Sequence, residues 1–391
     1  MYYIIVYTTV TTLVLGVTTF LYKYLAEYLY SRKTLSITEF DVISVVPDDI
    51  NLSNNKQSSL TLIIDKELLQ NKDNTDITFI TTVIEEYNKL NKDLTSDFVV
   101  DIFTNKTDNQ NKFSVTKLIT TTNSKVALYI PGNNDYFYNA KLAYSLKKKG
   151  YNFYAISFPN YGFTSNVNDT AFSSFNNMEF LFQYIEIILE HYNIKQIDLL
   201  LGYSTGGLIS IMYANYKNSK ESQFIKRCIL SSPFIDWYAD PINTSITGSE
   251  TFLEKVVTLM GLVVPKVNIK SVIGTINLTM CQDFNEINFN PKYKSLIEIH
   301  TYPEWIRACT LAQQQIQNGK IDMKCPVDIL HSDKSVYWSY SENADNSLDV
   351  DDITKYGTLI SSDTTFHKIN DSIHNCFIRV NIEDYLKNEI K

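Results

Sequence analysis

The chain has 391 residues, of which 44% are hydrophobic and 20% are charged, and its formal net charge is −8. This length and composition suit one large globular domain with additions, and the acidic balance argues against a general nucleic-acid-binding protein, which normally shows a basic face. The five cysteines are scattered without a Cys-x-x-Cys pair. We therefore expect buried free thiols, and neither a disulfide framework nor a metal site.

The N-terminal residues 2–22 contain no charged side chain, and their number is close to what a membrane-spanning helix needs. Tyrosines lie at both ends of this segment, where they suit the two interfacial belts of a bilayer. Lys23, Arg32 and Lys33 follow it, so the positive-inside rule places the remaining chain in the cytosol. We expect residues 1–33 to form a single-pass membrane anchor.

Residues 34–95 form an N-terminal extension whose structure the sequence does not define. From residue 96 to residue 391, short apolar runs alternate with amphipathic stretches, which predicts an α/β domain with a doubly wound, mostly parallel sheet. The predicted strands are 97–103, 114–119, 126–130, 153–158, 197–201, 228–231, 327–330 and 364–369. The predicted helices are 140–149, 178–192, 207–214 and 352–359, and Gly150 is expected to cap the first of them. A cap at approximately 238–322 is expected as an insertion after the sixth predicted strand.

The strongest chemical signal lies between the predicted strand 197–201 and the predicted helix 207–214. Gly202, Ser204 and Gly206 form the Gly-x-Ser-x-Gly pattern of a nucleophile elbow. Such a turn holds its central residue in a strained backbone conformation, and side chains two residues away would collide with the neighbouring strand and helix. Ser204 would then stand at a helix N-terminus, where free backbone N–H groups can hold a developing oxyanion.

The chain from about Asp97 to its end resembles the α/β-hydrolase superfamily, and within it the branch of monoacylglycerol lipases, lysophospholipases and serine-aminopeptidase-like proteins. Segments matching the family occur in its order at 130–137, 160–162, 202–207, 231–234, 305–308, 326–327, 330–333 and 347–350. The chain departs from the family at three positions that shape loops and do not perform the chemistry. Pro131 stands where a histidine is usual, Phe163 replaces an arginine and Ser157 replaces an aspartate.

A serine nucleophile needs an imidazole to take its proton and a carboxylate to orient that imidazole. In this fold the acid follows the serine and the histidine comes last. Of the five histidines, His374 alone follows the last predicted strand in a loop, where the family places its base. Three aspartates compete as the acid. Spacing favours Asp345, then Asp349, which also suits a helix N-cap, and then Asp333.

The resemblance implies an oxyanion hole made by the backbone N–H groups of Thr205 and Asn133. It also implies a serine hydrolase that cleaves a carboxylic ester through an acyl-enzyme, without a metal or organic cofactor. A lipid-like acyl ester, such as a monoacylglycerol or lysophospholipid, is the expected substrate. A peptidase or thioesterase with the same triad is the alternative enzyme, and a non-catalytic hydrolase-fold binding protein is the alternative of another class.

Overall fold

The protein is described by a computed structural model. It describes residues 40–45, 97–107, 112–120, 125–164, 177–237, 282–283, 286–287, 289, 293–294, 302–336 and 341–386. The expected membrane segment 2–22 and most of the expected cap lie outside the described residues. No helix among the described residues is long and apolar enough to cross a bilayer. The membrane anchor stays a prediction from the sequence.

The described strands form one nine-stranded sheet in the order β1-β2-β3-β5-β4-β6-β7-β8-β9. Their bounds are β1 Phe40–Val45, β2 Val99–Asn105, β3 Lys112–Leu118, β4 Lys125–Ile130, β5 Tyr151–Ser157, β6 Leu199–Tyr203, β7 Cys228–Ser231, β8 Val327–Ser332 and β9 Thr364–Ile369. Strands β1, β2 and β3 pair antiparallel with their neighbours, and the strands from β5 through β9 pair in parallel. The mostly parallel, doubly wound sheet predicted from the sequence is confirmed.

The order of the central strands determines where a site can form. The chain leaves β4 to one side to make β5 and then crosses to the other side to make β6, so β4 has both as parallel neighbours. In doubly wound sheets, ligands bind beyond the carboxyl ends of the strands at such a reversal. The turns that follow β4 and β6 are therefore the first places to look for chemistry.

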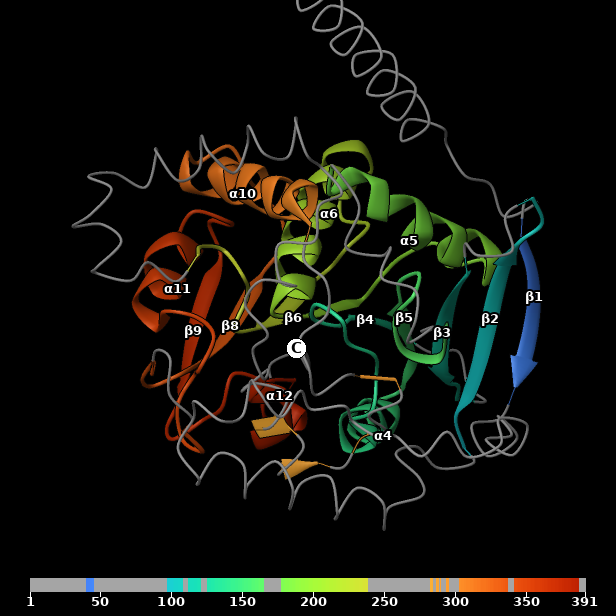
Figure 1. Ribbon diagram of the computed structural model, residues 1–391, viewed down its shortest axis with the longest axis horizontal. Coiled ribbons are helices and arrows are strands. Elements are labelled where there is room, and N and C mark those ends of the chain that lie inside the picture. The colour runs from blue at the N-terminus through green and yellow to red at the C-terminus, as the bar shows by residue number, and fades with distance from the viewer. Residues whose placement is uncertain are drawn as a thin grey trace, which may run out of the picture. The chain divides into compact units, whose positions relative to one another are not determined.

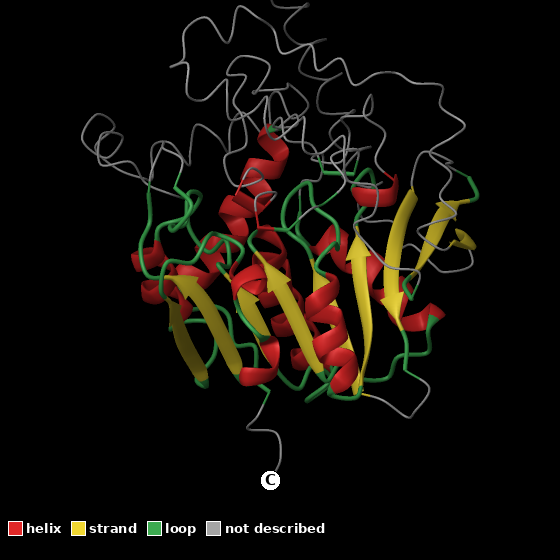
Figure 2. Cartoon of the chain, turned by 90° about the horizontal axis from the view of Figure 1, so that it is seen from below, coloured by secondary structure: helices red, strands yellow, loops and turns green. Residues whose placement is uncertain are grey.

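Helices cover both faces of the sheet. Their bounds are α4 Ala140–Lys148, α5 Glu179–His191, α6 Thr205–Lys220, α10 Pro303–Gln317, α11 Val350–Gly357 and α12 Cys376–Arg379. Figure 1 shows α4 and α12 on one side of the strands and α5, α6 and α10 on the other, and Figure 2 shows the strands as one layer between them. On the first face, Tyr129, Leu201 and Leu330 pack with Leu142 of α4 and Phe377 of α12.

Most predicted elements lie within a few residues of their observed bounds, and Gly150 ends α4 with a φ of 83°. The four described cysteines are buried free thiols, as expected.

The structure adds β1, an edge strand inside the extension 34–95, whose Phe40 ring packs edge-on against Phe113 of β3 at 5.4 Å. The predicted insertion follows β7, and α10 lies within its range.

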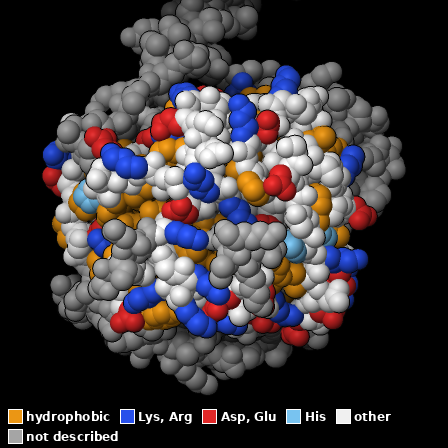
Figure 3. All heavy atoms as spheres, turned by 180° about the vertical axis from the view of Figure 1, so that it is seen from behind, with side chains coloured by type: hydrophobic (Ala, Val, Ile, Leu, Met, Phe, Trp, Pro, Cys, Tyr) orange, Lys and Arg blue, Asp and Glu red, His pale blue; other side chains and the backbone are white. Residues whose placement is uncertain are grey.

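The described surface carries mixed charge. On the face seen in Figure 3, lysine and arginine side chains are interspersed with aspartate and glutamate side chains. This face shows no large region of one sign over its described part.

We predict that Gly357→Ala destabilises the protein, although alanine is favoured over glycine in helices by about 1 kcal/mol. An added Cβ at Gly357 would lie 2.7 Å from Ile329 Cδ1 and 2.8 Å from Phe366 Cε1, so α11 would be pushed away from β8 and β9. Overpacking of this kind costs about 1–3 kcal/mol, to be measured by urea unfolding. Lys355→Ala, on the exposed side of α11, is the control with a change below about 0.5 kcal/mol. An unchanged or raised stability in Gly357→Ala would contradict this packing.

Candidate active site

Ser204 occupies a strained turn between β6 and α6. Its backbone has φ 54° and ψ −121°, in a region that non-glycine residues seldom adopt. The turn is held by hydrogen bonds on both sides: the Ser204 N–H donates to the carbonyl of Ser231 at 3.0 Å, and the Ser204 carbonyl accepts from the N–H groups of Gly207 at 2.8 Å and Phe234 at 3.0 Å. The surrounding strands therefore maintain a conformation in which the serine hydroxyl stands clear of the sheet.

The glycines on either side of Ser204 are required by close contacts. A Cβ at Gly202 would lie 2.4 Å from Ser210 Oγ, and a Cβ at Gly206 would lie 2.2 Å from the carbonyl oxygens of both Ile130 and Pro131. No side chain fits at these distances without moving backbone. The steric argument made from the Gly-x-Ser-x-Gly spacing therefore applies to this turn.

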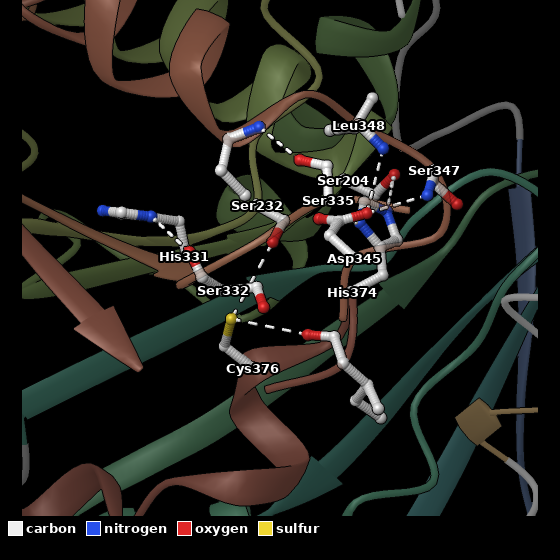
Figure 4. Close-up of polar contacts among 12 residues, drawn as sticks. Ser204, Ser232, His331, Ser332, Ser335, Asp345, Ser347, Leu348, His374 and Cys376 are labelled. Atoms are coloured by element: carbon white, nitrogen blue, oxygen red, sulfur yellow. Dashed lines mark hydrogen bonds and ion pairs between the residues drawn. The ribbon is translucent and has the colours of Figure 1, made fainter. Parts of the chain in front are cut away.

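His374 lies in the loop between β9 and α12 and reaches the serine (Figure 4). Its Nε2 is 2.9 Å from Ser204 Oγ, and its Nδ1 is 2.8 Å from Asp345 Oδ2. An ionised carboxylate only accepts hydrogen bonds, so Nδ1 carries the proton and Nε2 is left to accept the Ser204 O–H. The imidazole is almost completely buried, with 2% of its surface exposed. This arrangement can remove a proton from the serine hydroxyl.

Asp345 is buried and held by several donors. One carboxylate oxygen accepts the N–H groups of Ser347 at 2.8 Å and Leu348 at 2.9 Å, and the other faces His374. Burial alone would raise the pKa of this carboxyl, but the electrostatic attraction of the neighbouring His374 and these hydrogen bonds outweigh it and hold the pKa below its usual value. Asp345 therefore stays ionised over the whole neutral range.

The two other aspartates that spacing left open have different partners. Asp349 is the N-cap of α11, and its Oδ1 accepts the N–H of Asp351 at 2.9 Å. Asp333 Oδ1 accepts the N–H of Asp371 at 2.8 Å, which ties two loops together. Among the three, Asp345 is the one that the structure brings to the imidazole.

Several serines hold the loop of His374, and the sequence analysis did not identify them. Ser332 Oγ, at the end of β8, donates to the carbonyl of Ser372 at 2.6 Å. Ser231 Oγ, at the end of β7, accepts the N–H of Cys376 at 2.9 Å. Ser232 Oγ lies 3.8 Å from Cys376 Sγ. Figure 4 shows the contact between Ser232 and Cys376. Their signal in the sequence was the presence of small polar residues at the carboxyl ends of parallel strands.

The expected oxyanion donors lie on the two turns that follow β4 and β6. Thr205 is the first residue of α6, where a backbone N–H has no acceptor within the helix. A Cβ at Gly132 would lie 3.4 Å from Ser204 Cβ, which places the turn of Gly132 and Asn133 against the nucleophile. Asn133 Oδ1 accepts the hydroxyl of Tyr161 at 2.6 Å. The backbone N–H groups of Thr205 and Asn133 are thus carried by two segments that both lie next to Ser204.

The structure shows what surrounds the three residues that depart from the family pattern. Pro131 contributes one of the carbonyl oxygens that exclude a side chain at Gly206. Ser157 is completely buried at the end of β5. Phe163 packs its ring against those of Tyr136 at 5.5 Å and Tyr293 at 4.8 Å. None of the three lies between the serine, the imidazole and the carboxylate.

Comparisons with known proteins agree with this architecture. Residues 129–259 match the model of the alpha/beta hydrolase fold family. No curated protein was found to match the chain. The structure of a soluble variant of monoglyceride lipase from Saccharomyces cerevisiae, in complex with a substrate analog, is 16% identical, covers 70% of this chain and 90% of its own, and has a TM-score of 0.50.

Two further solved structures are similar over a comparable length. The monoacylglycerol lipase of Paleococcus ferrophilus is 14% identical, covers 68% of this chain and 91% of its own, and has a TM-score of 0.48. The thioesterase domain from the curacin biosynthetic pathway is 13% identical, covers 70% and 93%, and has a TM-score of 0.45. The strand order, the elbow and the family match lead to one conclusion: the chain has the α/β-hydrolase fold, and its residues 129–259 match the model of that family.

Proposed function

We propose that the protein is a serine hydrolase that cleaves a carboxylic ester through an acyl-enzyme. The observation that carries this proposal is the continuous hydrogen-bonded path from Ser204 Oγ through the His374 ring to Asp345, at 2.9 and 2.8 Å. A nucleophile, a base and an orienting carboxylate at these distances form the arrangement that activates a serine hydroxyl. The strained elbow supports the same assignment, because strain of this kind is concentrated at functional sites.

In the proposed mechanism, Ser204 Oγ attacks the ester carbonyl while His374 Nε2 takes the hydroxyl proton. The Asp345 carboxylate stabilises the imidazolium that forms, and the N–H groups of Thr205 and Asn133 hold the oxyanion. The imidazolium then donates its proton to the departing alcohol, which leaves an acyl group on Ser204. A water molecule, deprotonated by His374, then attacks this acyl group. The bond to Ser204 Oγ breaks, the imidazolium returns its proton to that oxygen, and the carboxylic acid leaves.

The proposed substrate is a lipid-like acyl ester of the monoacylglycerol or lysophospholipid type. Aromatic side chains next to the nucleophile support this choice. Phe234, whose N–H bonds to Ser204, packs its ring against Trp237 at 4.7 Å, and Trp237 packs against Trp305 at 6.1 Å. Sites for apolar ligands are lined mainly by hydrophobic and aromatic side chains, and an acyl chain is such a ligand. The fold shared with the yeast monoglyceride lipase and the family resemblance point to the same substrate class.

We predict that Ser204→Ala lowers turnover of p-nitrophenyl butyrate by at least about 10³-fold, because the residual rate depends on binding and the oxyanion donors alone. The full-length protein is assayed with Ser219→Ala as the matched control. Ser219 is an exposed residue near the end of the same helix, so its variant is expected to keep wild-type activity. If the folded wild-type chain has no Ser204-dependent turnover, the non-catalytic binding protein becomes the better description.

A second prediction separates the candidate acids. Asp345→Asn replaces a carboxylate by an amide that can donate to Nδ1, which favours the unproductive tautomer, so kcat is expected to fall about 10³- to 10⁴-fold. Asn is also a good N-cap, so Asp349→Asn is expected to change kcat by less than about twofold. The two variants are compared by steady-state kinetics. A larger loss in Asp349→Asn than in Asp345→Asn would show that the wrong aspartate has been assigned.

The lipid-like substrate class predicts a dependence on acyl length. Burial of each added methylene contributes about 0.8 kcal/mol, so kcat/KM for p-nitrophenyl esters is expected to rise about two- to fourfold per methylene over the medium chain lengths. The series from acetate to laurate is measured below the concentrations at which the longer esters aggregate. A flat or falling series would instead indicate an esterase for short acyl groups.

A further inference from the structure

A buried ion cluster lies outside the Ser204–His374–Asp345 path. Lys294 Nζ lies 3.1 Å from Asp135 Oδ1 and 2.7 Å from Asp283 Oδ2, and all three side chains are completely buried. The Tyr138 hydroxyl belongs to the same cluster. It donates to Asp283 Oδ2 at 2.8 Å and accepts from Lys294 Nζ at 2.7 Å. One ammonium group is thus shared by two carboxylates and a phenol.

The cluster joins segments that carry groups of the proposed reaction. Asp135 and Tyr138 follow Asn133 in the segment between β4 and α4. Asp283 and Lys294 come from the range expected for the cap.

The loop of His374 reaches the same cluster from another side. Asn375, the residue after His374, donates from Nδ2 to the Tyr138 hydroxyl at 3.5 Å. The residue after Tyr138, Asn139, donates from its own Nδ2 to the carbonyl of Phe377 at 3.0 Å. The segment of Asn133 and the segment of His374 are therefore connected to each other and, through Lys294, to the cap range.

Aromatic rings surround these charges. Lys294 Nζ lies 4.4 Å from the ring centre of Tyr138 and 4.8 Å from that of Phe289. Tyr136 and Tyr293 are buried in the same group, and Phe163 packs against it. Electrostatic attraction is stronger in such a low-dielectric setting, so the cluster fixes relative positions more firmly than an exposed ion pair does.

The charge of Asp135 is costly to the fold. Burial and the neighbouring Asp283 carboxylate raise its pKa to about 6, although Lys294 opposes the rise. A carboxyl whose pKa is raised on folding lowers the stability of the protein as pH rises from its unfolded pKa, near 4, through 6. At neutral pH the ionised Asp135 is therefore a cost to the fold, which is typical of groups that serve function.

We propose that the cluster centred on Lys294 positions the oxyanion segment and the loop of His374 for reaction, so that Asp135, Tyr138 and Lys294 act on kcat as positioning residues. This inference rests on the proposed ester hydrolysis. Displacement of reacting groups by about 1 Å can lower a rate by about 100-fold, so a cluster outside the hydrogen-bonded path can matter for the chemical step. The binding of substrate through apolar surface is expected to depend less on this cluster than the chemical step does.

The direct test compares Tyr138→Phe with Tyr213→Phe in the full-length protein. Both changes remove a buried hydroxyl that donates to a carboxylate at 2.8 Å, but Tyr213 bonds to Glu186 and lies along α6. Tyr138→Phe is expected to lower kcat for p-nitrophenyl butyrate about tenfold or more, with KM changed less than about twofold. Tyr213→Phe is expected to keep kcat within about twofold of the wild type.

A second variant, Asp135→Asn, keeps the proposal testable if Tyr138→Phe does not fold. Its Tm at pH 8 is expected to equal or exceed that of the wild type, because the costly charge is gone, while kcat falls. A purely structural role predicts the reverse, with a lowered Tm and an unchanged kcat.

The outcomes separate this inference from the proposed function. If the wild-type protein shows Ser204-dependent turnover and Tyr138→Phe or Asp135→Asn keeps the wild-type kcat, the positioning role is overturned. The proposed function then remains. An equal loss of kcat in Tyr138→Phe and Tyr213→Phe overturns it as well, because the effect is then not specific to the cluster. If the wild-type chain has no Ser204-dependent turnover, the proposed function and the positioning role both fall.

Discussion

The close approach of the β6–α6 turn to the end of β4 is the contact on which the site depends. The backbone at Gly206 lies so near the carbonyl oxygens of Ile130 and Pro131 that no side chain fits between them. This contact fixes Ser204 and the first N–H of α6 relative to the turn that follows β4. Parallel pairing of β4 with β6 brings both turns to the same edge of the sheet. The local strain at Ser204 is tolerated because the neighbouring strands hold its backbone on both sides.

Two buried carboxylates near this edge differ in their partners and therefore in their pKa values. Asp345 accepts hydrogen bonds from two backbone N–H groups and faces the imidazole, and its pKa lies below the usual value although burial opposes this. Asp135 shares the ammonium of Lys294 with a second carboxylate, and burial raises its pKa to about 6. The negative charge of Asp345 is stabilised by its neighbours. Asp135 belongs to a buried cluster that joins the segment of Asn133 to the loop of His374, and for that reason we assign it a part in the reaction.

The sequence predicted the features that depend on local chemistry. Apolar runs located the strands, glycine spacing located the elbow, and chain order selected His374 among the histidines. For the acid, spacing favoured Asp345 but left Asp349 and Asp333 open, because all three lie in the same stretch between β8 and α11. Their difference arises from the path of the loop, in which the Asp345 N–H donates to the carbonyl of Lys334 at 3.0 Å.

Other features depended on partners far away in the chain. Strand β1 is six residues long, and its partner among the described strands is β2, which lies beyond the rest of the extension 34–95. Periodicity within so short a segment does not reveal such a partner. The pairing of Lys294 with Asp135 was equally hidden. Asp135 lies in the family-matching segment 130–137, but Lys294 belongs to no such segment, and nothing local in the sequence links the two. Charged residues are normally read as solvent-exposed, and here the fold buries both completely.

Reaction of Ser204 with a fluorophosphonate probe is the most direct test of the central claim that this serine is activated. The full-length protein is treated with the probe at neutral pH, and the modified residue is identified by peptide mass spectrometry. The account predicts one phosphonylated serine, Ser204, and strongly reduced labelling when Asp345 is replaced by Asn. A folded wild-type protein that remains unlabelled, or that is labelled equally at other serines, would contradict it.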